Sequence, residues 1–108
     1  MSTTNPPVLR ADAEDVWRED SLVRRSGIAW NEIYRISAYK LDCMTRVAVV
    51  VTLDWDYGEF FELIDDWVGF DEVVRLITAR VPGIDPNWMD CIRSLEPQQP
   101  VIEIWKRS

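Results

Sequence analysis

The stretch RVAVVVTLDW, residues 46–55, is the clearest secondary-structure signal in the chain. β-Branched residues dominate it, and large apolar side chains recur at every second position from Val47 to Trp55. Because successive side chains of a strand point to opposite faces, this spacing predicts a strand with one apolar face. The other face, from Arg46 to Asp54, becomes more polar toward its end, which indicates a sheet covered chiefly on one side.

The residues that follow predict the return half of a β-hairpin. Residues 56–58, DYG, are typical of a tight turn, in which Gly58 accepts a positive φ without steric cost. The segment Glu59–Asp65 then predicts the partner strand, which is antiparallel because the connection is short.

Residues 14–25 predict an earlier hairpin. They contain two short apolar pieces, Val16-Trp17 and Leu22-Val23, surrounded by charges. Residues 19–21, EDS, are typical of the turn between them. Gly27 then predicts a break in the secondary structure.

The segment after this break combines two periodicities. Trp30–Glu32 predicts a short turn, and the alternation that begins at Tyr34 predicts a strand from Ile33 to Leu41. At its end, Lys40 and Asp42 share a face and are expected to form an exposed ion pair, worth on the order of 0–1 kcal/mol. The alternative is that Lys40 holds an anion.

Residues 69–81, GFDEVVRLITARV, predict an amphipathic helix. Asp71 and Glu72 lie in its first turn and Arg80 in its last, so that each charge matches the helix macrodipole. Pro82-Gly83 is expected to end this helix.

A second helix is predicted directly afterwards. Asp85 is typical of a helix cap, Pro86 suits the first helical position, and an apolar stripe follows from Trp88 to Leu95. Val101–Trp105 then has the β-branched and aromatic content of a last strand.

This order of elements predicts an α+β fold, an antiparallel sheet with two helices near the C-terminus followed by a last strand. Residues 8–108 are expected to form a single domain. Residues 1–7 predict a disordered leader, because they are polar and lack the apolar segment of a secretory signal. The expected location is the cytoplasm. The residues expected to be most buried are Val49, Val51, Leu53, Val73, Val74 and Ile77.

The composition disfavours most catalytic chemistry. The chain has no His and no phosphate-binding Gly-rich loop, and Cys43 and Cys91 lack the short spacing of metal ligands. Without a signal for an oxidising compartment, both cysteines are expected to be free thiols. We therefore expect no enzymatic activity, no cofactor and no metal.

The net charge of −7 is concentrated in one part of the chain. Between Val47 and Val74 there are eight acidic residues, six aromatic residues and no Lys or Arg. Such a surface favours a basic protein partner and disfavours nucleic acid, since the basic pair Lys106-Arg107 is short and isolated. The longest apolar run, Val47–Val51, is too short to span a membrane. The predicted partner-binding residues are Asp54, Trp55, Asp56, Tyr57, Glu59, Glu62, Asp65, Asp66 and Trp67.

Two other functions would use the same carboxylates. Asp54, Asp56 and Glu59 are candidate calcium ligands. Asp54 with Asp56, or Asp65 with Asp66, is a candidate pair for acid–base catalysis. Acids that converge in a pocket would favour a small-molecule or metal-binding domain, or a carboxylate-dependent enzyme. A flat acidic face with exposed rings would favour the protein binder.

The two tryptophans in this stretch, Trp55 and Trp67, each lie beside acidic residues. Burial would make them part of the core. Exposure would make them the anchors of an acidic, aromatic interface.

The pattern WxxIxxIxAxKxD, from Trp30 to Asp42, is followed by an apolar strand and an acidic stretch that leads into Gly69-Phe70. This arrangement resembles small uncharacterised bacterial proteins with a pleckstrin-homology-like sheet, and small acidic immunity proteins of bacterial toxin systems. The resemblance implies a partial barrel and an immunity-type inhibitor of a basic toxin. Phosphoinositide binding is not implied, because the basic loop between the first strands is missing and the chain continues beyond the first helix.

Overall fold

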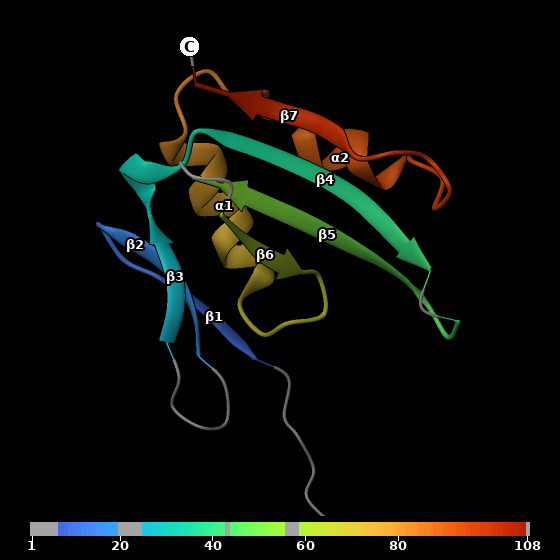
Figure 1. Ribbon diagram of the computed structural model, residues 1–108, viewed down its shortest axis with the longest axis horizontal. Helices are drawn as coiled ribbons and strands as arrows, with labels where there is room; N and C mark the ends of the chain where they lie inside the picture. Colours follow the sequence, from blue (N-terminus) through green and yellow to red (C-terminus); the bar gives the residue numbers. More distant parts are fainter. Residues whose placement is uncertain (1–6, 20–24, 43, 56–58, 108) are drawn as a thin grey trace, which may run out of the picture.

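The computed structural model describes residues 7–19, 25–42, 44–55 and 59–107. These residues form two antiparallel sheets, two α-helices and one 3-10 turn, which confirms the α+β class (Figure 1). The helical elements are η1 (Trp30–Glu32), α1 (Phe70–Arg80) and α2 (Trp88–Arg93). The strands are β1 (Val8–Ala11), β2 (Asp15–Glu19), β3 (Arg25–Ala29), β4 (Arg35–Asp42), β5 (Val47–Asp54), β6 (Phe60–Ile64) and β7 (Ile102–Lys106).

The first sheet contains three strands in the order β1-β2-β3, so the prediction of one sheet is wrong. The predicted early hairpin is shifted, because β2 pairs with a strand that begins only at Arg25 and places Ile28 opposite Val16. The predicted apolar pair Leu22-Val23 lies outside the described residues, as do residues 1–6 of the predicted leader. β1, with four residues, is too short to give a clear alternating pattern.

Gly27 lies inside β3 and does not form the predicted break. It is paired with Trp17, at a point where the two strands approach closely. A Cβ atom at this position would lie 2.2 Å from the Val16 carbonyl oxygen and 2.5 Å from the Trp17 Cα. The glycine therefore serves strand packing, because a side chain here would force β2 and β3 apart.

The larger sheet has the strand order β6-β5-β4-β7. Its neighbouring strands are all antiparallel, and a register shift between Ile36 and Ser37 interrupts the pairing of β4 with β7. The bounds of these strands differ by one or two residues from the predicted ones, and the predicted turn at residues 56–58 lies outside the described residues. The described strands form two open sheets and not a closed barrel.

The hydrophobic core lies between the inner face of the larger sheet, the two helices and the smaller sheet. Figure 1 shows α1 and α2 behind the larger sheet, with the smaller sheet beside α1. The predicted core is confirmed except for Val74, which is only partly buried at the margin of the helix stripe. Fully buried side chains from all these layers meet here: Val16, Ile36, Val51, Leu53, Leu63, Val73, Ile77 and Ile92.

Strand β5 is buried on both faces, which its sequence pattern does not indicate. Its inner face belongs to the core, and Ala48, Val50 and Asp54 on the outer face are also buried. Asp54, at the end of this face that the sequence predicts to be solvent-exposed, is only 7% exposed. The central position of β5 explains the difference, because side chains of β4 and β6 flank it on both sides.

Helix α2 is shorter than its sequence predicts. It begins at Trp88 after the N-cap Asn87, and Asp85 lies in the preceding turn, where its Oδ1 accepts a hydrogen bond from the Asn87 amide at 2.9 Å. Trp88 is buried, whereas Cys91 is an exposed free thiol. Cys43 lies outside the described residues. Neither described helix is long and apolar enough to cross a membrane.

Lys40 does not form the predicted ion pair with Asp42. Its Nζ donates a hydrogen bond to the carbonyl of Arg93 at 2.6 Å, one of the carbonyls that the end of α2 leaves without a helical partner. A cation at this end also matches the helix macrodipole. Asp42 instead accepts a hydrogen bond from the Met44 amide at 3.1 Å. Strand alternation turns Lys40 toward the helix-covered face, and this makes it a link between β4 and α2.

The start of α1 is tied to β1 by a close backbone contact. The Leu9 amide donates a hydrogen bond to the Val68 carbonyl at 2.7 Å. Gly69 follows with a φ of 90°, and a Cβ atom there would lie 2.2 Å from the Leu9 carbonyl oxygen. Only glycine combines this left-handed conformation with such close approach to a neighbouring strand.

Substitution of a core residue of β5 tests the assignment of its faces. Val51→Asp is expected to prevent folding, because an unpaired carboxylate in the core costs several kcal/mol, on the order of the whole stability of a domain. Val47→Asn is the control in the same strand, at a position that is 41% exposed and lies opposite Asp42, and its melting temperature should remain close to that of the unchanged protein. A normal melting curve for Val51→Asp would show that the faces are assigned wrongly.

Two glycine substitutions separate backbone strain from steric contact. Gly69 and Gly83 both have positive φ, 90° and 80°, so Gly→Ala costs about 1 kcal/mol at each from the backbone alone. At Gly83 an added Cβ meets nothing within 4 Å, whereas at Gly69 it meets the Leu9 carbonyl. Denaturant unfolding should therefore show a clearly larger loss of free energy for Gly69→Ala. Equal losses would contradict the proposed contact between β1 and α1.

Candidate functional site

The outer face of the larger sheet is the surface on which several predicted site residues lie. Paired residues of neighbouring strands point to the same side of a sheet, and the helices cover the other side (Figure 1). We call this surface the open face, since no described helix or strand lies over it in Figure 1. Its side chains on β4, β5 and β6, assigned from the strand register, are Arg35, Ser37, Tyr39, Leu41, Ala48, Val50, Thr52, Asp54, Phe60, Glu62 and Ile64. On β7, Glu103 and Lys106 pair with Ser37 and Arg35 on the same side.

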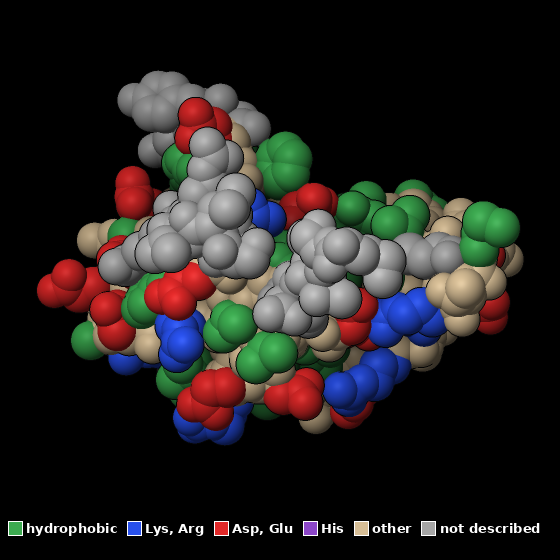
Figure 2. Space-filling model, turned by 90° about the horizontal axis from the view of Figure 1, so that it is seen from below, with side chains coloured by type: hydrophobic (Ala, Val, Ile, Leu, Met, Phe, Trp, Pro, Cys, Tyr) green, Lys and Arg blue, Asp and Glu red, His purple; other side chains and the backbone are tan. Residues whose placement is uncertain are grey.

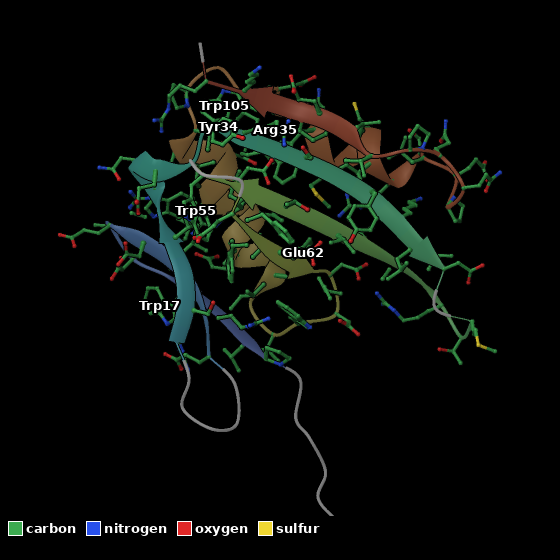
Figure 3. All side chains as sticks on the ribbon, in the orientation of Figure 1. Trp17, Tyr34, Arg35, Trp55, Glu62 and Trp105 are labelled. Carbon is green, nitrogen blue, oxygen red and sulfur yellow. The ribbon has the colours of Figure 1, made fainter. Side chains whose placement is uncertain are left out.

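Asp54 forms an ion pair on the open face. Its Oδ2 accepts a hydrogen bond from Arg35 Nε at 2.6 Å, and its side chain is only 10% exposed. The hydrogen bond to the Asp54 carboxylate raises the pKa of the Arg35 guanidinium. Arg35 (Figure 3) therefore compensates the charge of Asp54. The paired carboxylate stabilises the open face more than it serves to bind a cation from solvent.

Glu62 is held by a second polar contact across the sheet. The Tyr39 hydroxyl, from the far side of β5, donates a hydrogen bond to Glu62 Oε2 at 2.9 Å. Burial raises the pKa of Tyr39, and the hydrogen bond to the negative Glu62 raises it further. Glu62 (Figure 3) remains partly exposed, so its carboxylate is accessible to a cation from solvent.

The two tryptophans of the predicted site belong to the margin of the core. Trp55 and Trp67 are both partly buried and pack against the core residues. The Arg18 guanidinium also lies over the Trp67 ring, 5.5 Å from its centroid. Neither ring is therefore a fully exposed anchor.

Phe60 is the exposed ring that the sequence analysis did not select. Its side chain is 57% exposed on the open face, whereas Phe61 is buried in the core. The signal was present in the sequence, because two adjacent phenylalanines in a strand must point to opposite faces. The face of each could be assigned only with the register of β6 against β5.

The remaining predicted acids are distributed over different surroundings. Glu59 and Asp66 are exposed, and Asp65 is paired with Arg46. Asp56 and Tyr57 lie outside the described residues. Figure 2 shows acidic side chains interspersed with Lys, Arg and hydrophobic side chains on one side of the molecule. The acidic side chains on that side thus do not form one uninterrupted patch.

The predicted carboxylates do not converge on a cavity. Of three cavities formed by the described residues, none is lined by Asp54, Glu59, Glu62, Asp65 or Asp66. Within the described ranges, no group of three His, Cys, Asp or Glu side chains is arranged to hold a metal ion. One of these cavities, a groove of about 550 Å³ beside Lys106 and Arg107, instead has a basic and aromatic lining that the sequence analysis did not find.

Comparison with protein-family models, curated proteins and solved structures finds no match to this chain. Its function must therefore be inferred from the side chains themselves.

The Tyr39–Glu62 contact has a measurable pH dependence. The folded-state pKa of Tyr39 is raised above its ordinary value of 10.0. The stability that depends on protonated Tyr39 is thus fully present below about pH 10 and is lost as the pH rises through the folded-state pKa. Tyrosinate absorbance should show a late titration that Tyr39→Phe removes.

Glu62→Gln should lower the pKa of Tyr39 without returning it fully to the ordinary value, because the charge disappears and the burial remains. Glu59→Gln is the matched control and should leave the late titration in place. An unchanged titration in Glu62→Gln would mean that the hydrogen bond does not form in solution.

Proposed function

We propose that this chain is a non-enzymatic protein-binding module that contacts a basic partner through the β6 side of the open face. The observation that carries the proposal is Phe60, an apolar ring that is 57% exposed between Glu59 and Glu62. An immunity-type inhibitor of a basic toxin is the sharpest form of this function. Phe60 replaces Trp55 and Trp67 as the proposed anchor residue of the interface.

The chemistry of this surface suits a protein partner. A large ring that is covered on binding anchors the bound state, and removing the exposed part of Phe60 from water contributes on the order of 1 kcal/mol. Tyr39 and Ile64 are partly exposed on the same face, beyond Glu62, and would extend the contact along the strands. The contact between Tyr39 and Glu62 also holds both side chains in place before binding, which lowers the entropic cost of association.

The acids near Phe60 would act on the rate of association. Glu59 and Asp66 are exposed, and Glu62 is partly exposed. Carboxylates on the rim of an interface attract a cationic partner over roughly 8–10 Å at physiological salt, and this attraction affects association more than dissociation. Asp54 has a different role, because its pairing with Arg35 stabilises the face that presents Phe60.

The two functions that need converging carboxylates have less support. Asp54 and Asp65 are each neutralised by an arginine, and a carboxylate paired in this way is a weaker metal ligand or general base. No cavity described above brings the predicted acids together. An open surface with an exposed ring is the arrangement typical of protein recognition.

The proposal is tested by kinetics with a captured partner. Candidate partners are first captured from cells with the unchanged protein, and each is then purified and measured at low and physiological salt. Glu59→Lys combined with Glu62→Lys should slow association at least tenfold at low salt, and Phe60→Ala should speed dissociation at least fivefold. The fold of each variant is checked by its melting temperature.

Asp90→Lys is the control for the charge change, since Asp90 is an exposed acid on α2, at the helix-covered side of the sheet. It should alter neither rate. If the double charge reversal leaves the association rate and its salt dependence unchanged, the acids near Phe60 are only a solvated surface and the proposal fails.

A further inference from the structure

A groove beside the end of β7 differs in charge from the rest of the molecule. It has a volume of about 550 Å³ and lies where η1, the last residues of α1 and the end of β7 meet. This volume is within the range of small-molecule sites, roughly 300–1,000 Å³. Figure 3 shows Trp105, one of its lining residues, at the end of β7. The residues that matter for its chemistry are Trp30, Arg80, Trp105, Lys106 and Arg107.

The lining of this groove contains three cations and no carboxylate, in a chain whose net charge is −7. The arginines are held by neutral groups. Arg107 Nη2 donates to the carbonyls of Asn31 and Ile33, each at 2.6 Å, and Arg80 Nη1 donates to the Ala13 carbonyl at 3.1 Å. A carbonyl positions a guanidinium without neutralising its charge.

Apart from Arg18, which lies over the Trp67 ring, most of the other described arginines are paired with carboxylates. Arg10, Arg35, Arg46, Arg75 and Arg93 each have a carboxylate partner. Among the described residues, neither Arg80 nor Arg107 has one. Both retain N–H groups beyond those used on the carbonyls, because a guanidinium carries five. The groove therefore has fixed positive charge and donors that an anion can use.

Two indole rings provide flat surface beside these charges. The Trp30 Nε1 donates to the Asp12 carbonyl and the Trp105 Nε1 to the Pro82 carbonyl, each at 2.9 Å. These bonds fix the orientation of both rings, which remain partly exposed. The Arg80 guanidinium lies 5.4 Å from the centroid of the Trp30 ring. A flat apolar surface thus adjoins an uncompensated cation, and a flat ligand with a negative group can contact both.

We propose that this groove binds a small organic anion made of a planar ring and a carboxylate. The ring of the ligand lies against the indoles, and its carboxylate contacts Arg80, Lys106 and Arg107. The guanidinium groups of the arginines and the ammonium of the lysine both donate hydrogen bonds that suit carboxylate oxygens. A single negative charge is favoured over the double charge of a phosphate, because the negative end of the α1 macrodipole adjoins the groove. The site uses no side chain of the β6 side of the open face, so it goes beyond the proposed protein-binding function.

The test is an NMR titration of the full chain with naphthoate, in which the indole N–H signals of Trp30 and Trp105 are followed. Three matched probes dissect the ligand: neutral naphthamide, non-planar cyclohexanecarboxylate, and naphthyl phosphate. Naphthoate should shift both indole signals and bind at least tenfold more tightly than naphthamide or cyclohexanecarboxylate. Naphthyl phosphate should bind no more tightly than naphthoate.

Substitutions in α1 test whether Arg80 supplies the positive charge that binds the carboxylate. Arg80→Gln should weaken naphthoate binding at least fivefold. Arg80→Lys should bind more tightly than Arg80→Gln and more weakly than the unchanged protein, because an ammonium keeps the charge and loses the planar fork over Trp30. Arg75→Gln, on the same helix outside the groove, should leave binding unchanged. Melting temperatures establish that each variant is folded.

Three results would overturn the proposal: equal affinity for naphthoate and naphthamide, shifts confined to other tryptophans, or unchanged binding by folded Arg80→Gln. Tighter binding of naphthyl phosphate would overturn the assignment of a carboxylate. None of these outcomes bears on Phe60 and its partner, so the two proposals succeed or fail separately.

Discussion

The structure depends on covering the inner face of the larger sheet. Val51 and Leu53 of β5 and Ile36 of β4 are fully buried there, and removing such side chains from water is the main favourable contribution to folding. Both helices and the smaller sheet pack against this one surface. The contact between Leu9 and Val68 then positions β1 at the start of α1, so that the smaller sheet and the helix cover the core together.

Packing on one side leaves the other side of the sheet to be stabilised by its own side chains. The pair Arg35–Asp54 joins neighbouring strands, and the contact Tyr39–Glu62 joins next-neighbouring strands. These four polar side chains of the open face thus have partners within it. A face satisfied in this way needs no covering helix. Phe60 is therefore exposed on this face without the loss of stability that an unsatisfied polar surface would cause.

The charges have a different distribution in space from that along the chain. Within the acidic stretch, Asp54 and Asp65 are matched with Arg35 and Arg46, which come from outside it. At the groove, Arg80 joins a basic pair that lies more than twenty residues further along the chain, and backbone carbonyls hold it there. The charges available for binding are thus those that remain without a counterion after folding.

The sequence by itself determined the local properties of this protein. The alternation in residues 46–55 predicted β5 and its buried inner face, because side-chain direction in a strand follows from the backbone alone. Tertiary structure alone decided the separation of two sheets, the partial burial of Trp55 and Trp67, the exposure of Phe60 and the partners of each arginine. Each of these depends on register or on contacts between residues distant in the chain, which the pattern of one segment does not contain.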